Sequence, residues 1–134
     1  MITGSCFCAA ITWQLNGRLQ DGRACHCSRC RKAFSGASSA YAELTPGSRF
    51  QWITGKEKLV IHATGEEWGL GFCGVCGSTL CGIRRGEVHG VTLGCVEGDP
   101  GVAIEQHLFV GSKAPWDHIG GHAPQYLEHP PPRN

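Results

Sequence analysis

The chain has 134 residues, of which 41% are hydrophobic and 17% charged, and its formal net charge is +1 at pH 7. This length predicts one domain, and the composition is typical of a compact globule rather than a disordered chain. The small charge gives no electrostatic case for nucleic acid or an anionic membrane as the main partner. No apolar run approaches the roughly 20 residues of a membrane span. Residues 129–134, which lack core-forming side chains, are predicted to be a loose proline-rich tail after a domain of residues 1–128.

Taken in chain order, the hydrophobic pattern predicts a series of short strands. Alternating or β-branched segments are typical of strands, and here they are residues 10–15, 39–44, 50–54, 58–63, 68–72, 88–93 and 104–110. Turn signals such as Asn16-Gly17 and Pro46-Gly47 separate several of them. Short helical turns are expected only at the ends of residues 30–38 and after Pro115. Many short strands, together with 20 glycines, predict an all-β architecture.

Seven of the nine cysteines fall into three tight clusters. The clusters are Cys6 with Cys8, then Cys25 with Cys27 and Cys30, then Cys73 with Cys76. Two thiols one or two residues apart can reach the same ion, and zinc takes thiolate ligands tetrahedrally at about 2.3 Å. Seven thiolates therefore suit two zinc ions, one in a closed site of four cysteines and one in a site of three with a vacant position. A closed site is structural, whereas a vacant position is where zinc chemistry takes place.

A disulfide framework is the alternative use of these cysteines. Nine is an odd number, which leaves one thiol without a partner. The N-terminal sequence has no basic segment followed by an apolar run, so no signal peptide is visible and a cytoplasmic location is expected. In such a reducing compartment, clustered thiols are metal ligands far more often than disulfides.

The spacing also indicates how the thiols divide between two ions. Cys25, Cys27 and Cys30 lie within six residues and can hold an ion alone. In the simplest partition, the pair Cys6 and Cys8 then joins the pair Cys73 and Cys76. Closing the 64 residues between Cys8 and Cys73 costs about 4 kcal/mol of chain entropy. Structural zinc supplies roughly 10–16 kcal/mol, so the four-cysteine site is expected to clip the N-terminal edge to the middle of the chain.

The three-cysteine site is predicted to keep an open coordination position. A water or a soft ligand, above all a thiol, can enter there, and a thiol bound to zinc becomes a thiolate near neutral pH. Two alternatives compete with this interpretation. His26 could close the site, although alternation along an extended segment would direct its side chain away from Cys25 and Cys27. Cys27 and Cys30 could instead be a redox dithiol, although no βαβ pattern surrounds them.

Four motifs, in the same order as in a known family, span nearly the whole chain. They are residues 4–8 (GSCFC), 25–32 (CHCSRCRK), 72–80 (FCGVCGSTL) and 112–116 (SKAPW). With these motifs the chain resembles the glutathione-dependent formaldehyde-activating enzyme family, which also includes centromere protein V-like proteins. The resemblance implies small β-sheets around a zinc-binding β-tent. It also implies a structural zinc on Cys6, Cys8, Cys73 and Cys76, and a catalytic zinc on Cys25, Cys27 and Cys30.

The same resemblance implies a reaction. The family's name-giving reaction adds glutathione to formaldehyde to give S-hydroxymethylglutathione, and it is classed as a carbon–sulfur lyase reaction. The expected cofactor is Zn²⁺, two per chain, and the expected partners are a small-molecule thiol and a carbonyl. Because a family fixes fold and metal better than substrate, a non-catalytic zinc-binding interaction module is the alternative, and a redox protein is a weaker one.

Several further residues have an open role at this level. Cys81 and Cys95 depart from the family's pattern, and each is expected to be a buried cysteine acting as a small hydrophobe. The 112–116 motif either anchors the last segment by burying Trp116 or forms a pocket wall. Four basic residues flank the three-cysteine cluster and either hold the carboxylates of a glutathione-like ligand or form a solvated edge. They are Arg23, Arg29, Arg31 and Lys32.

Overall fold

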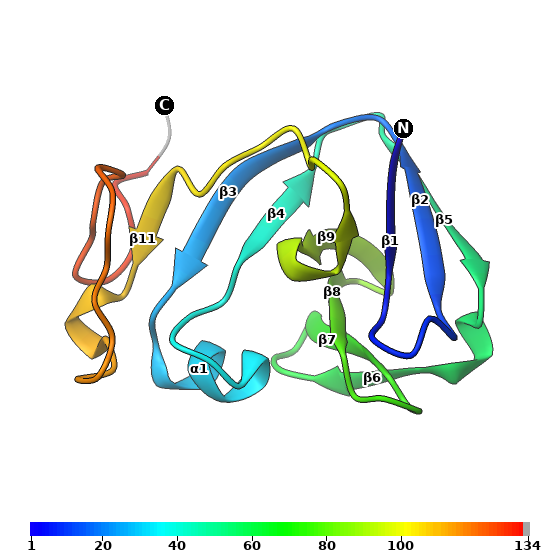
Figure 1. Cartoon of the computed structure of the whole chain (residues 1–134), viewed down its shortest axis with the longest axis horizontal. Coiled ribbons are helices and arrows are strands. Elements are labelled where there is room, and N and C mark those ends of the chain that lie inside the picture. The colour runs from blue at the N-terminus through cyan, green and yellow to red at the C-terminus, as the bar shows by residue number, and fades with distance from the viewer. Residues whose placement is uncertain (133–134) are drawn as a thin grey trace.

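The computed structural model describes residues 1–132, which form two β-sheets, one short α-helix and three 3-10 turns (Figure 1). The smaller sheet is antiparallel with strand order β10-β1-β2-β5. Its strands are β10 (Val96–Glu97), β1 (Ile2–Ser5), β2 (Thr12–Asn16) and β5 (Arg49–Thr54). The expected all-β fold class is thereby confirmed.

The larger sheet has strand order β11-β3-β4-β9-β8-β7-β6, and only the β11–β3 pair is parallel. Its strands are β11 (Gln106–Leu108), β3 (Leu19–Cys25), β4 (Tyr41–Leu44), β9 (Glu87–Thr92), β8 (Thr79–Arg84), β7 (Trp68–Cys73) and β6 (Leu59–Ala63). The remaining elements are α1 (Ser28–Phe34), η1 (Lys56–Lys58), η2 (Leu93–Cys95) and η3 (Val110–Ser112). None of the helices in residues 1–132 is long and apolar enough to cross a membrane.

All seven segments predicted as strands overlap one, but β1, β3, β8 and the two-residue β10 were not predicted. Strand β3 carries the polar run Gln20-Asp21-Gly22-Arg23, which hides its alternation of buried and half-exposed positions. Its Gly22 lies so close to the carbonyl of Ala103 that a Cβ would overlap it. Strand β8 is buried at Leu80, Cys81, Gly82 and Ile83 without a polar alternation. The helical turn predicted near Cys30 is the helix α1, which begins two residues earlier.

The core lies between the two sheets. Ile11, Trp13 and Leu15 on or beside β2 are at most 1% exposed and belong to one cluster with Leu80 and Val91 of the larger sheet. The Trp13 ring lies 5.3 Å from that of Phe50. A Cβ on Gly4 of β1 would overlap the Trp13 indole, so glycine is required there. Full burial of such side chains contributes about 1.5–3 kcal/mol each, which holds the small sheet against the large one.

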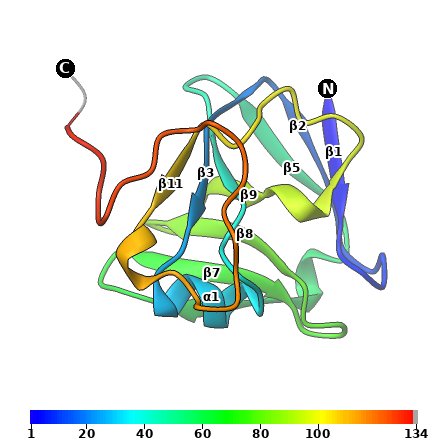
Figure 2. The same ribbon diagram turned by 60° about the vertical axis from the view of Figure 1, so that its left-hand side comes forward.

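The C-terminal segment runs back beside β11 (Figures 1 and 2). His107 N–H donates to the Pro124 carbonyl at 2.8 Å, and Tyr126 N–H donates to the His107 carbonyl at 2.9 Å. The ring of His129 meets the ring of Phe109 edge-on at 4.8 Å. The last two residues of the predicted tail, Arg133 and Asn134, lie outside the described residues.

Candidate metal centres and active-site cavity

The fold brings the seven clustered cysteines together as two separate groups within residues 1–132. In the first, the four sulfurs of Cys6, Cys8, Cys73 and Cys76 lie within 4.8 Å of one another. Cys8 Sγ is 3.7 Å from Cys6 Sγ and 3.9 Å from Cys73 Sγ. Sulfurs that surround zinc tetrahedrally at about 2.3 Å are about 3.8 Å apart. The residues therefore fit a four-thiolate zinc site.

Two hairpin turns, one from each sheet, supply these four thiols. Cys6 N–H donates to the Ile11 carbonyl at 3.1 Å in the β1–β2 turn, and Gly77 N–H donates to the Cys73 carbonyl at 2.8 Å in the β7–β8 turn. Gly77 has φ +82°, which side-chain-bearing residues rarely adopt. A metal ion in this position would join the two sheets at buried Cys6 and Cys73.

Backbone amides point at the sulfurs of this group. Ile11 N–H donates to Cys6 Sγ at 3.3 Å, and Val75 N–H donates to Cys73 Sγ at 3.4 Å. Ser78 Oγ lies 3.2 Å from Cys76 Sγ and accepts from Phe7 N–H at 2.9 Å, so it connects the two turns. The hydrogen bond with Ser78 lowers the pKa of Cys76 to about 5. Such donors favour the thiolate, which is the form that binds metal.

The second group consists of Cys25, Cys27 and Cys30, whose sulfurs also lie within 4.8 Å of one another. Cys25 ends β3, Cys27 is the N-cap of α1, and Cys30 lies in the first turn of that helix. Cys30 N–H donates to Cys27 Sγ at 3.4 Å. A hydrogen bond from the Cys30 thiol lowers the pKa of Cys25 to about 6. The chemistry of three convergent thiols fits a zinc ion that keeps a fourth position for another ligand.

His26 does not belong to this group. Its side chain is buried, and its Nε2 lies 3.0 Å from Nδ1 of His107 on β11. Its Nδ1 lies 4.0 Å from an oxygen of Asp117. Adjacent side chains on an extended segment point to opposite sides, so the turn that gathers the thiols sends the imidazole toward β11. The alternative of a closed Cys₃His site is therefore not what the structure forms.

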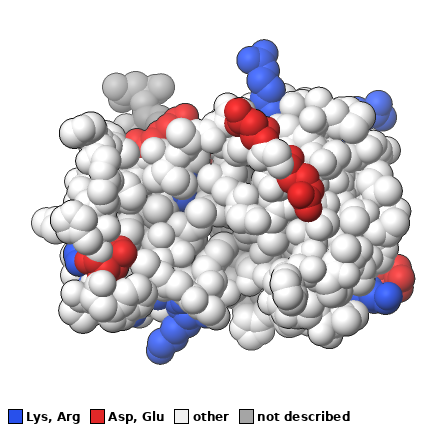
Figure 3. All heavy atoms as spheres, viewed as in Figure 1, with Lys and Arg blue, Asp and Glu red and all other residues white. Residues whose placement is uncertain are grey.

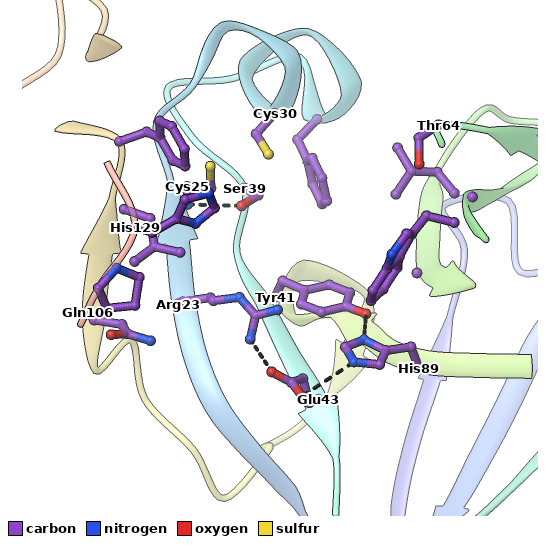
Figure 4. Close-up of a pocket in the computed structure, with 18 residues that line it drawn as sticks. Arg23, Cys25, Cys30, Ser39, Tyr41, Glu43, Thr64, His89, Gln106 and His129 are labelled. Atoms are coloured by element: carbon purple, nitrogen blue, oxygen red, sulfur yellow. Dashed lines mark hydrogen bonds and ion pairs between the residues drawn. The ribbon is translucent and has the colours of Figure 1, made fainter. Parts of the chain in front are cut away.

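Two cavities meet at Cys30. The first has a volume of about 490 Å³ and is bordered by Cys25 and Cys30 at one end (Figure 4). Its walls are largely apolar and include Phe34, Trp68 and Leu108. The second has a volume of about 570 Å³ and is bordered by Cys27 and Cys30. Volumes of this size are typical of small-molecule sites.

A hydrogen-bonded network of four residues forms the other end of the first cavity (Figure 4). Tyr41 Oη lies 2.8 Å from Nδ1 of His89, and His89 Nε2 lies 3.3 Å from a carboxylate oxygen of Glu43. Arg23 Nη1 donates to the other Glu43 oxygen at 2.6 Å, and its guanidinium lies 5.1 Å from the centre of the Tyr41 ring. Three neighbouring strands, β3, β4 and β9, bring these residues together.

The basic residues around the three-cysteine group separate into different environments. Arg23 is paired with Glu43 inside the first cavity. Arg29 and Lys32 are exposed and border the second cavity, where Arg29 Nη2 donates to the Thr64 carbonyl at 2.9 Å. On the face that Figure 3 shows, Lys and Arg side chains lie at separate places, whereas several Asp and Glu side chains lie near one another along the upper part. Arg23 therefore does not belong to a solvated basic edge, Arg31 is half-buried, and Arg29 and Lys32 are exposed as such an edge requires.

Comparison with known proteins agrees with this geometry. The sequence model of one protein family, described as glutathione-dependent formaldehyde-activating enzyme, matches residues 1–112. The chain belongs to this family. A solved structure of a Rhodobacter sphaeroides protein is similar to the present structure, with a TM-score of 0.57 and 27% sequence identity. The similarity covers 92% of this chain and 99% of that chain. None of the curated proteins matches.

The structure of the present chain also shows where Cys81, Cys95 and the 112–116 motif lie. Cys81 is 1% exposed in the core, as expected, and Cys95 is half-buried with its Sγ 3.6 Å from the Thr79 carbonyl. Trp116 is not buried, because its side chain is 70% exposed. No residue of the 112–116 motif borders either of the two cavities at Cys30, so the motif does not form a wall of them. Buried Ala114 anchors the 112–116 motif instead, with Lys113 Nζ donating to the Asp117 carbonyl at 2.6 Å.

Sequence reasoning missed Tyr41, Glu43 and His89. Each lies in a segment predicted as a strand. Their hydrogen bonds to one another form only because β4 and β9 are neighbours in the sheet, which the sequence pattern does not show. β4 and β9 are neighbours in the sheet, although 42 residues separate the end of β4 from the start of β9. The polar residues Tyr41 and Glu43 at alternate positions of one strand share a face, which was the one signal available.

Proposed function

We propose that this protein is a zinc-dependent carbon–sulfur lyase that joins a thiol such as glutathione to a small carbonyl such as formaldehyde. The observation that carries the proposal is the three-cysteine group, which borders two cavities and has no fourth protein ligand among the residues gathered there. Family membership supports the reaction type. A reducing cytoplasm would keep these thiols free for metal.

The two cysteine groups have different roles in this proposal. Cys6, Cys8, Cys73 and Cys76 would hold a structural zinc, because four thiolates close the coordination sphere. Cys25, Cys27 and Cys30 would hold a second zinc. When bound there, zinc supplies a Lewis acid that favours the thiolate form of an incoming thiol.

The second cavity suits the thiol substrate. Glutathione carries two carboxylates, and Arg29 and Lys32 border this cavity next to Cys27 and Cys30. Charge-assisted hydrogen bonds from these side chains would orient the thiol so that its sulfur reaches the cysteine group. Binding of this kind contributes by positioning rather than by bond making.

The first cavity suits the carbonyl substrate. It opens beside the same cysteines, and its walls include the aromatic side chains of Phe34 and Trp68. Its volume of about 490 Å³ leaves room for more than formaldehyde, so larger aldehydes fit as well. The thiol and the carbonyl would then approach each other at Cys30, where the two cavities meet.

The test is the rate of adduct formation from glutathione and formaldehyde, measured by NMR exchange spectroscopy above the spontaneous rate. Zinc-loaded wild type should accelerate the exchange. Cys27→Ser should lose both the acceleration and zinc-dependent thiol binding, whereas Cys95→Ser, which changes a half-buried thiol outside both groups, should behave as wild type. Binding of glutathione by wild type without any acceleration would favour the non-catalytic module instead.

A further inference from the structure

The network at the far end of the first cavity has a defined direction of hydrogen bonding. The Glu43 carboxylate is ion-paired with Arg23, so it accepts from His89 Nε2–H at 3.3 Å. The neutral imidazole then carries no proton on Nδ1, which accepts the Tyr41 hydroxyl proton at 2.8 Å. The chain therefore runs from Tyr41 through His89 to Glu43, and the Arg23 ion pair holds Glu43 in place.

Packing holds the hydrogen-bonded residues Tyr41, His89 and Glu43 in place. The Tyr41 ring lies over Gly82 of β8 and Gly90 of β9, where a Cβ on either glycine would overlap it. The Trp68 ring meets the His89 ring edge-on at 5.0 Å. The side chains of Arg23, Glu43 and His89 are about one-fifth exposed, at 21%, 18% and 19%. Two strand glycines thus make room for a tyrosine whose hydroxyl lies against a histidine at the cavity wall.

Burial also favours the neutral forms of His89 and Tyr41, which proton transfer between them requires. Desolvation holds the pKa of His89 below its usual value, so its imidazole is neutral at pH 7. Desolvation raises the pKa of Tyr41 well above its usual range, so the phenol keeps its proton. A neutral imidazole that accepts from a phenol can take up a proton and later return it.

We propose that Tyr41, with His89 and Glu43 behind it, is the proton carrier of the reaction at the cysteine group. The inference rests on the proposed function. It is drawn because the Tyr41–His89–Glu43 hydrogen-bond series and the pair Cys25 and Cys30 border the same cavity (Figure 4). Tyr41 is the catalytic residue, and His89 and Glu43 are positioning residues that act through it.

The step balances without an outside acid or base. The thiol S–H bond breaks, and its proton passes to Tyr41 Oη as the phenol proton moves to His89 Nδ1. The sulfur electron pair forms the S–C bond, and the C=O π pair moves to oxygen. That oxygen takes the proton of Tyr41 Oη, and His89 returns its proton to Tyr41. The products are the hydroxyalkyl thioether and the original network, and the reverse sequence releases the thiol and the carbonyl.

The test compares Tyr41→Phe with Tyr126→Phe, since the chain has two tyrosines and Tyr126 lies outside the cavity. We expect Tyr41→Phe to lower kcat about 100-fold or more while the KM for glutathione and the zinc content stay unchanged. Tyr126→Phe should match wild type. His89→Gln should lower kcat similarly, with partial rescue by added imidazole, which a purely structural role would not allow.

A second readout does not depend on activity. In ¹⁵N-histidine-labelled protein, His89 should show the Nε2–H tautomer, and Tyr41→Phe should move the Nδ1 resonance because its donor is lost. An active wild type whose Tyr41→Phe variant keeps its kcat would overturn the relay alone, as would a His89 protonated on Nδ1. A wild type without any rate acceleration would overturn the proposed function and the catalytic role of the relay with it.

Discussion

Replacing Cys73 by serine is the sharpest test of the four-cysteine site. Cys73 is fully buried, at 0% exposed, and its sulfur lies 3.9 Å from that of Cys8, a residue 65 positions earlier. Holding two points so distant in sequence together costs about 4 kcal/mol of chain entropy. A zinc ion on four thiolates offsets this cost, and a serine hydroxyl in place of one thiolate would not.

The expected effect follows from that magnitude. For a chain of this size, 1 kcal/mol corresponds to about 3–5 °C in Tm, so the loss of the clip should lower Tm by roughly 12 °C or more. Burying a hydroxyl costs stability by itself, about 1–3 kcal/mol. The matched control is therefore Cys81→Ser, which buries a hydroxyl in the same core at 1% exposed without removing a ligand.

The assay is thermal unfolding with and without a zinc chelator. Wild type and Cys81→Ser should both lose stability when the metal is removed, and Cys73→Ser should start from the lower Tm and respond only weakly. A Cys73→Ser variant whose Tm is no lower than that of Cys81→Ser, and which responds to the chelator as wild type does, would show that the four cysteines do not hold a stabilising zinc.

The seven clustered thiols should react with a thiol reagent only after the metal is chelated. Cys81 should react only after unfolding, because burial raises its pKa to about 12. Rapid reaction of Cys27 and Cys30 in metal-loaded protein would favour a redox role instead. Gly82→Ala should cost about 1–3 kcal/mol of stability by displacing the Tyr41 ring, whereas Gly94→Ala, with open space around it, should cost less. Arg29→Ala and Lys32→Ala should each raise the KM for glutathione by up to about 5-fold, as expected for exposed charges, and an unchanged KM in both would remove the second cavity from thiol binding.

Local chemistry made the cysteine groups predictable. Cys25, Cys27 and Cys30 are close in sequence, so a turn and the first helical turn suffice to gather them. The pairing of Cys6 and Cys8 with Cys73 and Cys76 needed only the count of ligands that zinc prefers. The strands with β-branched or alternating residues, such as residues 10–15 and 58–63, were predictable for the same local reason.

What could not be predicted depends on contacts between distant segments. Strand β3 looks polar because its outer positions carry Gln20 and Arg23, and only its neighbours β4 and β11 show why it is a strand. The partnership of Tyr41 with His89 requires that β4 and β9 pair, and no pattern within either segment encodes that. Trp116 illustrates the opposite error, since a large aromatic side chain suggested burial where the structure exposes it.

Zinc content is the measurement that tests the central claim most directly, namely that this chain holds two separate metal ions and that Cys25, Cys27 and Cys30 hold one of them. Protein purified under reducing, chelator-free conditions should contain about two zinc ions per chain, because each ion needs at least three of the seven clustered thiolates. Cys27→Ser should contain about one, and Cys95→Ser about two. A wild type with one zinc, or a Cys27→Ser variant that keeps two, would contradict the account.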